Sequence, residues 1–276
     1  MRRTKVLSFG ACIIGILAAF VPSYGRTTSS DYSHETITQL IDDLTQIDSE
    51  SPGISFSVIY VGFAAEDTSA SAWMNTRGVA PPEVPPQMRE LIRRGPLALP
   101  ELIKHLEDKR PTKLEVGGYP HVFSAKVFGY EYDPRVRDPE PTPLGFSQWT
   151  QKGFASAYTV KVGDVCYALI GQIVNRHLNA VRLQPTGFLV VNSPIEVPDL
   201  IEKVKSDWGS GDAETLKASL LADIHGANRL VGFKQDAYIE WVANPALRRL
   251  KLYFPEDYRA LPSGNLPRKA DFERSR

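Results

Sequence analysis

The clearest pattern of hydrophobic and polar positions lies in the stretch VGDVCYALIGQIVNRH, residues 162–177. Its apolar side chains recur every three or four residues and form one unbroken stripe, which also contains Cys166 and His177. The pattern predicts a helix whose stripe lies in the protein core. Cys166 is then a small buried side chain, and His177 lies about 16 Å further along the helix, too far away to activate the thiol. A Cys–His active site within this helix is therefore excluded.

The opposite side of this helix carries polar residues. Asp164 and Asn175 lie there with Gly171, and Gln172 flanks them. A glycine inside a helix costs about 1 kcal/mol relative to alanine, so Gly171 indicates that another backbone or a ring packs closely against it. Three interpretations stay open. Asp164 in the first turn and Arg176 in the last could simply complement the helix dipole, the polar residues could form a buried network, or they could line a ligand pocket.

Shorter amphipathic patterns predict helices before this stretch. Ser33 is the predicted N-cap of a helix whose apolar positions continue to Leu44. The segment PPQMRELIRRG predicts a second helix, which ends at Gly95. PLALPELIKHLEDKRPTK follows at once with its own apolar face, so these two helices should form a helical hairpin.

Helices are also predicted after residue 190. One begins at Ser193, as part of a capping box, or at Pro198. Asp212 is the predicted N-cap of the next, and residues 229–254 should be helical in parts. The charged segment 256–276 is predicted to be a flexible tail.

Few segments have the composition of strands. Residues 55–62, SFSVIYVG, are one, and residues 188–191 fit either a buried strand or a packed turn. KLEV at 113–116 and HVFSAKVFGYEY at 121–132 predict a β-hairpin over about 113–132. The predicted fold class is therefore mainly α, with a small β-hairpin element.

The N-terminus has the three-part pattern of a secretory signal peptide. MRRTK is basic, residues 6–21 are apolar and uncharged, and PSYG supplies small residues. The apolar core is shorter than the roughly 20 residues that a membrane-spanning helix needs. We predict that residues 1–25 are a signal peptide cleaved after Gly25 and that residues 26–33 are a polar tether. The protein is then exported to the periplasm or the medium; an uncleaved N-terminal membrane anchor is the alternative.

The charge balance and the cysteine content argue against two classes of protein, nucleic-acid-binding proteins and disulfide-stabilised scaffolds. The chain has 32 Lys+Arg and 32 Asp+Glu, and removal of residues 1–25 leaves a net charge of −3. Such a balance offers no basic surface for nucleic acid. Cys12 leaves with the signal segment, so Cys166 alone cannot form an intramolecular disulfide.

Two resemblances concern the helical hairpin and the general layout. GPLALPELIKHLED resembles the second helix of a HEAT-type repeat over about 25 residues, and no second copy follows at a fixed period. GDVCYALIGQIVNR and LQPTGFLVVNSP resemble a bacterial family of proteins with a signal peptide. The first resemblance implies an irregular HEAT-like pairing of helices, and the second implies no activity.

Candidate site residues come from the long helix and from one polar turn. The sequence contains no HExxH, P-loop, GxGxxG or GxSxG motif, and its five histidines are scattered, so we predict no metal, no cofactor and no catalytic residue. The turn YEYDPRVRD could supply partners for the polar side of the 162–177 helix. The candidate binding residues are Glu131, Asp133, Arg135, Asp164, Gln172, Asn175 and Arg176.

These observations lead to a single helical domain over residues 34–255 and to three hypotheses about function. The first is an exported, non-catalytic binding or scaffold module with a protein partner in the cell envelope, because helical pairs commonly present concave protein-binding surfaces. The alternative is an envelope or extracellular hydrolase with a site between the 131–135 turn and the polar face of the 162–177 helix. The third, a membrane-tethered structural protein, requires that the signal segment stays uncleaved.

Overall fold

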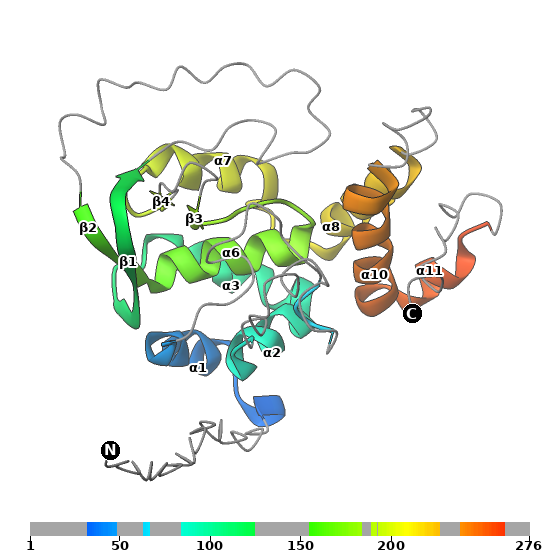
Figure 1. Cartoon of the computed structure of the whole chain (residues 1–276). Coiled ribbons are helices and arrows are strands. Elements are labelled where there is room, and N and C mark those ends of the chain that lie inside the picture. The colour runs from blue at the N-terminus through cyan, green and yellow to red at the C-terminus, as the bar shows by residue number, and fades with distance from the viewer. Residues whose placement is uncertain are drawn as a thin grey trace, which may run out of the picture. The chain divides into compact units, whose positions relative to one another are not determined.

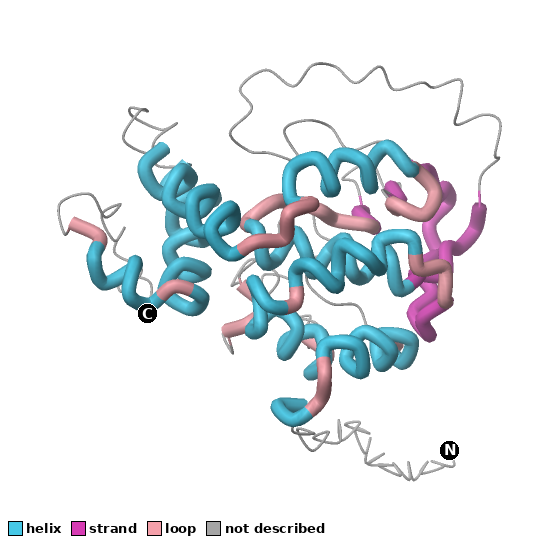
Figure 2. The backbone as a smooth tube through the Cα atoms, turned by 180° about the vertical axis from the view of Figure 1, so that it is seen from behind, coloured by secondary structure: helices cyan, strands magenta, loops and turns pink. Residues whose placement is uncertain are grey.

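Helix α6, Val162–Val174, lies at the centre of the described structure (Figures 1 and 2). The computed structural model describes residues 32–48, 63–66, 84–124, 155–183, 189–191, 193–226 and 238–262. All 13 residues of α6 are buried, as expected of a helix that other elements surround on every side. Helix α7, Pro198–Trp208, lies on one side of α6, and helices α1, Ile37–Asp42, and α2, Pro86–Arg94, lie on the other. Helix α3, Leu99–Lys104, packs against α6 and also contacts α7.

The first described α-helix begins about one turn later than the sequence predicts. Tyr32–His34 form the short 3₁₀ helix η1, followed by α1, Ile37–Asp42, and η2, Asp43–Gln46. The N-cap of α1 is Thr36 rather than Ser33. Its Oγ1 accepts from the Gln39 backbone N at 3.2 Å, and Gln39 Oε1 accepts from the Thr36 backbone N at 2.8 Å. This reciprocal pair of bonds satisfies two backbone donors, whereas Ser33 lies in the turn of η1.

The predicted helical hairpin is present. Helix α2, Pro86–Arg94, ends at Gly95, and the 3₁₀ turn η4, Gly95–Leu97, leads into α3, Leu99–Lys104, and η5, His105–Glu107. Gly95 has φ +42°, a conformation that favours glycine, and a Cβ there would overlap the ring of Tyr253. The glycine therefore allows both the sharp turn and the close approach of a distant helix.

A small four-stranded sheet covers one end of α6. Its order is β2-β1-β4-β3, with β1 Pro111–Ser124, β2 Ala155–Lys161, β3 Val181–Leu183 and β4 Leu189–Val191. Strand β1 pairs antiparallel with β2 and parallel with β4, and β3 pairs antiparallel with β4. Thr112, Leu114 and Val116 are buried while the residues between them are exposed, the alternation of a strand with one face on the core.

The small β element is thus confirmed, with a later second strand than predicted. Residues 111–124 form one continuous strand, and its antiparallel partner is β2 rather than a segment before residue 132. Residues 125–132 and the predicted strand at 55–62 lie outside the described residues. Of the ambiguous segment 188–191, Leu189–Val191 are a strand, β4.

The C-terminal helices pack at the other end of α6 (Figure 1). Helix α7 begins at Pro198, because Ser193 instead stabilises a separate turn by accepting from Ile195 N at 3.1 Å and Glu196 N at 3.3 Å. Helix α8, Ala213–Gly226, has the predicted N-cap: Asp212 Oδ1 accepts from Thr215 N at 2.6 Å. The π-helical segment η7, Ile239–Ala243, continues into α10, Asn244–Tyr253.

The predicted tail starts with a helix. Pro255–Ala260 form α11, with Pro255 at its first position, where proline suits a helix start. Residues 263–276 lie outside the described part of the chain. Within the described residues, no helix combines the length and hydrophobicity needed to cross a bilayer.

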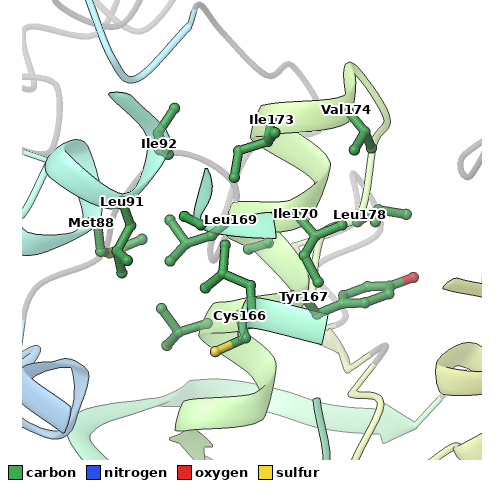
Figure 3. Packing of buried hydrophobic residues seen from close by; sticks show 14 of the residues in the cluster. Met88, Leu91, Ile92, Cys166, Tyr167, Leu169, Ile170, Ile173, Val174 and Leu178 are labelled. Carbon is green, nitrogen blue, oxygen red and sulfur yellow. The ribbon is translucent and has the colours of Figure 1, made fainter. Parts of the chain in front are cut away.

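The hydrophobic core forms around α6. Met88, Leu91 and Ile92 of α2 point toward the side of α6 that carries Leu169 and Ile173 (Figure 3). Tyr167 points to another side of the same helix, near Leu178 (Figure 3). The apolar stripe of the sequence is therefore in the core, as predicted, and the described chain is mainly helical with a small sheet.

Candidate functional site

A cluster of buried polar residues surrounds the C-terminal end of α6. We call Gln172, Asn175, Arg176, Asp223 and Arg249 the α6 C-terminal cluster; all five are buried. Asn175 has φ +61°, and its left-handed conformation ends the helix, a role for which asparagine is the usual substitute for glycine. Arg176 therefore lies just beyond the helix and not in its last turn as predicted.

Arg176 and Asp223 form the ion pair of this cluster. Arg176 Nη1 and Asp223 Oδ2 are 2.7 Å apart, with side chains 1% and 0% exposed. Asn175 Nδ2 donates to the same carboxylate oxygen at 2.9 Å and to the Val242 carbonyl of η7 at 3.1 Å. Arg176 Nη2 also donates to Ser219 Oγ of α8 at 2.9 Å. Two adjacent residues after α6 thus join it to α8 and to η7.

Arg249 of α10 caps α6 from another direction. Its Nε donates to the Gln172 carbonyl at 2.5 Å, and its Nη1 donates to the Pro245 carbonyl at 2.9 Å. The last carbonyls of a helix have no partner within the helix and carry partial negative charge. Two buried arginines at this end therefore satisfy carbonyls and complement the helix dipole at the same time.

Close packing on Gly171 is confirmed. A Cβ at this position would lie 2.7 Å from the Arg176 carbonyl oxygen and 2.8 Å from Leu178 Cβ. The chain reverses at Asn175 and returns across the helix, so the neighbouring backbone that the sequence predicted is the protein's own next turn. The Gly171 carbonyl also accepts from Arg176 N at 3.0 Å, which holds that turn in place.

Substitution Gly171→Ala should therefore destabilise the protein, although alanine is the better helix former. We expect a loss of about 1–3 kcal/mol in the free energy of unfolding, because the turn must move to admit the methyl group. Urea unfolding followed by circular dichroism measures the loss. Ala168→Gly, on the same helix, is the control and should cost about 2 kcal/mol, from lost helix propensity and the loss of a buried methyl group. Unchanged or increased stability of Gly171→Ala would contradict the packing described above.

A second polar cluster lies at the N-terminal end of α6. Asp164 Oδ2 accepts from Tyr158 Oη at 2.7 Å and from Lys161 N at 2.9 Å, and Lys161 Nζ donates to Tyr158 Oη at 3.2 Å. Burial raises the pKa of Asp164, and hydrogen bonds from Ser193, Lys161 N and Tyr158 oppose this increase. Burial and the neighbouring Asp164 raise the pKa of Tyr158. This cluster joins β2 to α6 and to the turn at Ser193.

The structure therefore divides the predicted polar face between two ends of one helix. Gln172, Asn175 and Arg176 come together, whereas Asp164 lies about 16 Å away along α6, eleven residues earlier. The predicted partners Glu131, Asp133 and Arg135 lie outside the described residues.

Two members of the α6 C-terminal cluster were missed at the level of sequence. Asp223 lies on the buried face of α8 with Leu216, Leu220 and Ile224, and Arg249 is buried beside Leu250 on α10. A charged residue at an apolar position of an amphipathic pattern was the available signal. It marks a group that needs a buried partner, although it does not identify that partner.

Cys166 and His177 have the pKa shifts of buried groups. Burial raises the pKa of the Cys166 thiol, which opposes formation of the nucleophilic thiolate. Burial, together with the positive charges of Arg249 and Arg176, lowers the pKa of His177 to about 4. Neither group is prepared for catalysis near neutral pH. Among the described residues, no three His, Cys, Asp or Glu side chains are grouped as metal ligands.

Comparisons with models of protein families, with curated proteins and with solved structures found no match. The α6 C-terminal cluster contains two permanently charged arginines and one carboxylate, all buried and bonded to neighbouring elements. These buried contacts fix the positions of α6, α8 and α10 relative to one another. The geometry of the cluster therefore supports a structural role.

Proposed function

We propose that the protein is exported and acts as a non-catalytic binding or scaffold module for a protein partner in the cell envelope. One observation carries the proposal: Asp164, Gln172, Asn175 and Arg176 are all buried, with hydrogen bonds to other parts of the chain. Polar groups used in this way stabilise a framework and are not available to a substrate. The helical hairpin of α2 and α3, whose sequence resembles a HEAT-type repeat, supports the proposal of a framework that presents a surface to other proteins.

Exposed apolar side chains support a protein partner. Among the described residues, Leu97 is 75% exposed, Trp241 41% and Leu252 43%. Trp241 and Leu252 belong to the consecutive segments η7 and α10, and tryptophan is enriched at the energetic centres of protein interfaces. We propose Trp241 and Leu252 as contacts of the partner.

A pull-down with a matched pair of variants tests this function. The exported product, whose N-terminus is sequenced first, is used as bait in an envelope extract. We expect wild type and Glu240→Ala to retain the same partner, and Trp241→Ala to lose at least about tenfold of it, since a truncated interface tryptophan typically costs 2 kcal/mol or more. Equal retention by both variants, or no partner at all, would refute the proposal. An intact Met1 would indicate the membrane-anchored alternative.

The hydrolase alternative has weaker support. It requires polar groups that converge on a substrate, whereas Ser193 and Asp164 are both fully buried. The net charge of −3 predicted for the processed chain gives no support for nucleic acid as a partner.

A further inference from the structure

The segment η7 has a hydrogen-bond register different from that of an α-helix. The Asn244 backbone N–H donates to the Ile239 carbonyl five residues earlier, whereas an α-helix uses the carbonyl four residues earlier. This turn of the helix therefore contains one extra residue. Such π-helical turns are rare and are found frequently at functional sites. The register of η7 therefore requires a physical cause, and its position next to α10 suggests a role.

Pro245, near the start of α10, opposes an α-helical register in η7. Residues 238–253 are helical without a break, so this proline lies inside a continuous helix. Proline has no backbone N–H, and its ring clashes with the carbonyl four residues earlier, which here belongs to Trp241. The wider π turn relieves this clash. Pro245 therefore favours the π register over the α register.

Asn175 of the α6 C-terminal cluster holds the π turn from outside the helix. Its Nδ2 donates to the Val242 carbonyl at 3.1 Å and to Asp223 Oδ2 at 2.9 Å. A side chain that bonds to a helix carbonyl interrupts the regular main-chain ladder. Asn175, Val242 and Asp223 are all buried, so water does not compete for these bonds. The π turn and the α6 C-terminal cluster therefore form one connected network.

The extra residue changes the direction of the side chains that precede it. One residue of an α-helix corresponds to a rotation of about 100° and a rise of about 1.5 Å. After the π turn, the position of α10 is fixed by hydrogen bonds of Arg249 to α6 and of Tyr253 to α2. Before it, the Tyr238 hydroxyl packs so closely on Gly226 of α8 that a Cβ there would overlap it. An α-helical register would rotate Tyr238 away from α8 while α10 kept its contacts.

Trp241 lies within the π turn, so its direction depends on the same register. Its side chain is 41% exposed, whereas the next two residues, Val242 and Ala243, are buried. We propose that Pro245 and Asn175 are positioning residues for the partner contact: they hold η7 in the π register and so set the direction in which Trp241 projects. This inference rests on the proposed function and deepens it, because it names the residues that position the contact.

Three variants of the full chain test the cause of the register. Pro245→Ala supplies the missing N–H, and Asn175→Gly removes the side-chain amide but tolerates the φ of +61° at that position. The double variant combines both changes. Pro255→Ala is the matched control, because this proline is at the first position of α11, where its N–H would have no helical acceptor.

NMR couplings across hydrogen bonds identify the carbonyl that accepts from the Asn244 N–H. We expect Ile239 in the wild-type chain and in Pro255→Ala, and a change to Glu240, the α-helical acceptor, in the double variant. A folded double variant that retains Ile239 as the acceptor would overturn the inference. If the double variant is unfolded by circular dichroism, Pro245→Ala decides: a population with Glu240 as the acceptor supports the inference, and Ile239 alone overturns it.

Partner retention in the pull-down tests the positioning role. The variant that has changed register should lose at least about tenfold of the partner that Pro255→Ala retains, although Trp241 itself is present. A changed register with full retention would overturn this inference and leave the proposed function intact. If the wild-type chain retains no partner, the proposed function is refuted and the positioning role with it, whereas the NMR result still shows whether Pro245 and Asn175 set the register.

Discussion

Replacement of Asp223 by alanine should cost about 3–5 kcal/mol of the free energy of unfolding, because it leaves the buried Arg176 guanidinium without its carboxylate. Asn175 loses a hydrogen-bond acceptor in the same substitution. A loss of this size is a large fraction of the 5–15 kcal/mol that stabilises a typical protein. Urea unfolding followed by tryptophan fluorescence is a suitable measurement, since the Trp208 ring centroid lies 5.8 Å from the Arg176 guanidinium.

Two controls separate the ion pair from general damage to α8. Asp212→Ala removes the exposed N-cap of the same helix and should cost about 1 kcal/mol. The double variant Arg176→Met/Asp223→Leu removes both charges and should be more stable than Asp223→Ala, because apolar side chains can often replace a buried ion pair without loss. If Asp223→Ala costs no more than Asp212→Ala, the ion pair does not hold α8 to the end of α6.

Acidification from pH 6.5 to pH 4 should destabilise the protein through His177. Its pKa is lowered from 6.5 to about 4 by burial, Arg249 and Arg176. Between these values the unfolded chain takes up a proton at His177 that the folded protein does not, so the stability contributed by the neutral imidazole is complete above pH 6.5 and lost as the pH falls. The difference between the two pKa values corresponds to a loss of at most about 3 kcal/mol in the free energy of unfolding. The loss is smaller to the extent that water reaches the partly exposed His177 side chain.

A variant without the imidazole isolates this effect. His177→Gln retains a polar side chain and does not titrate, while every other acidic and basic group is shared with wild type. The free energy of unfolding from urea titrations at pH 4, 5, 6 and 7 should therefore fall more steeply for wild type than for His177→Gln. Parallel pH dependences of the two proteins would show that His177 has the same pKa in the folded and unfolded chain.

Local patterns were sufficient for most of the described helices. The hairpin of α2 and α3 follows from two apolar faces and a glycine between them, and α8 begins after Asp212 as its capping residue predicts. These features depend on residues within about one helical turn of each other, so a single sequence contains the information. The sequence predicted α6 a few residues too long. Its apolar pattern continues to His177, but Asn175 adopts the left-handed backbone conformation and ends the helix.

The arrangement of the candidate site could be predicted only in part. The sequence indicated that Gln172, Asn175 and Arg176 need partners and that something packs on Gly171. It did not identify Asp223, Arg249 or Ala64 as those partners. Arg176 and Asp223 are 47 residues apart, and Gln172 and Ala64 are 108 apart.

The sequence by itself determined where most of the described helices form, which face of α6 lies in the core, and that its polar side requires close partners. Only the tertiary structure decided that β1 pairs with β2 and β4, and that α8 and α10 bring Asp223 and Arg249 to the same end of α6. The physical reason is the range of the interactions. Helical periodicity and capping act between residues a few positions apart, whereas buried charges and strand edges are satisfied by whichever distant segment the packing of the whole core places beside them.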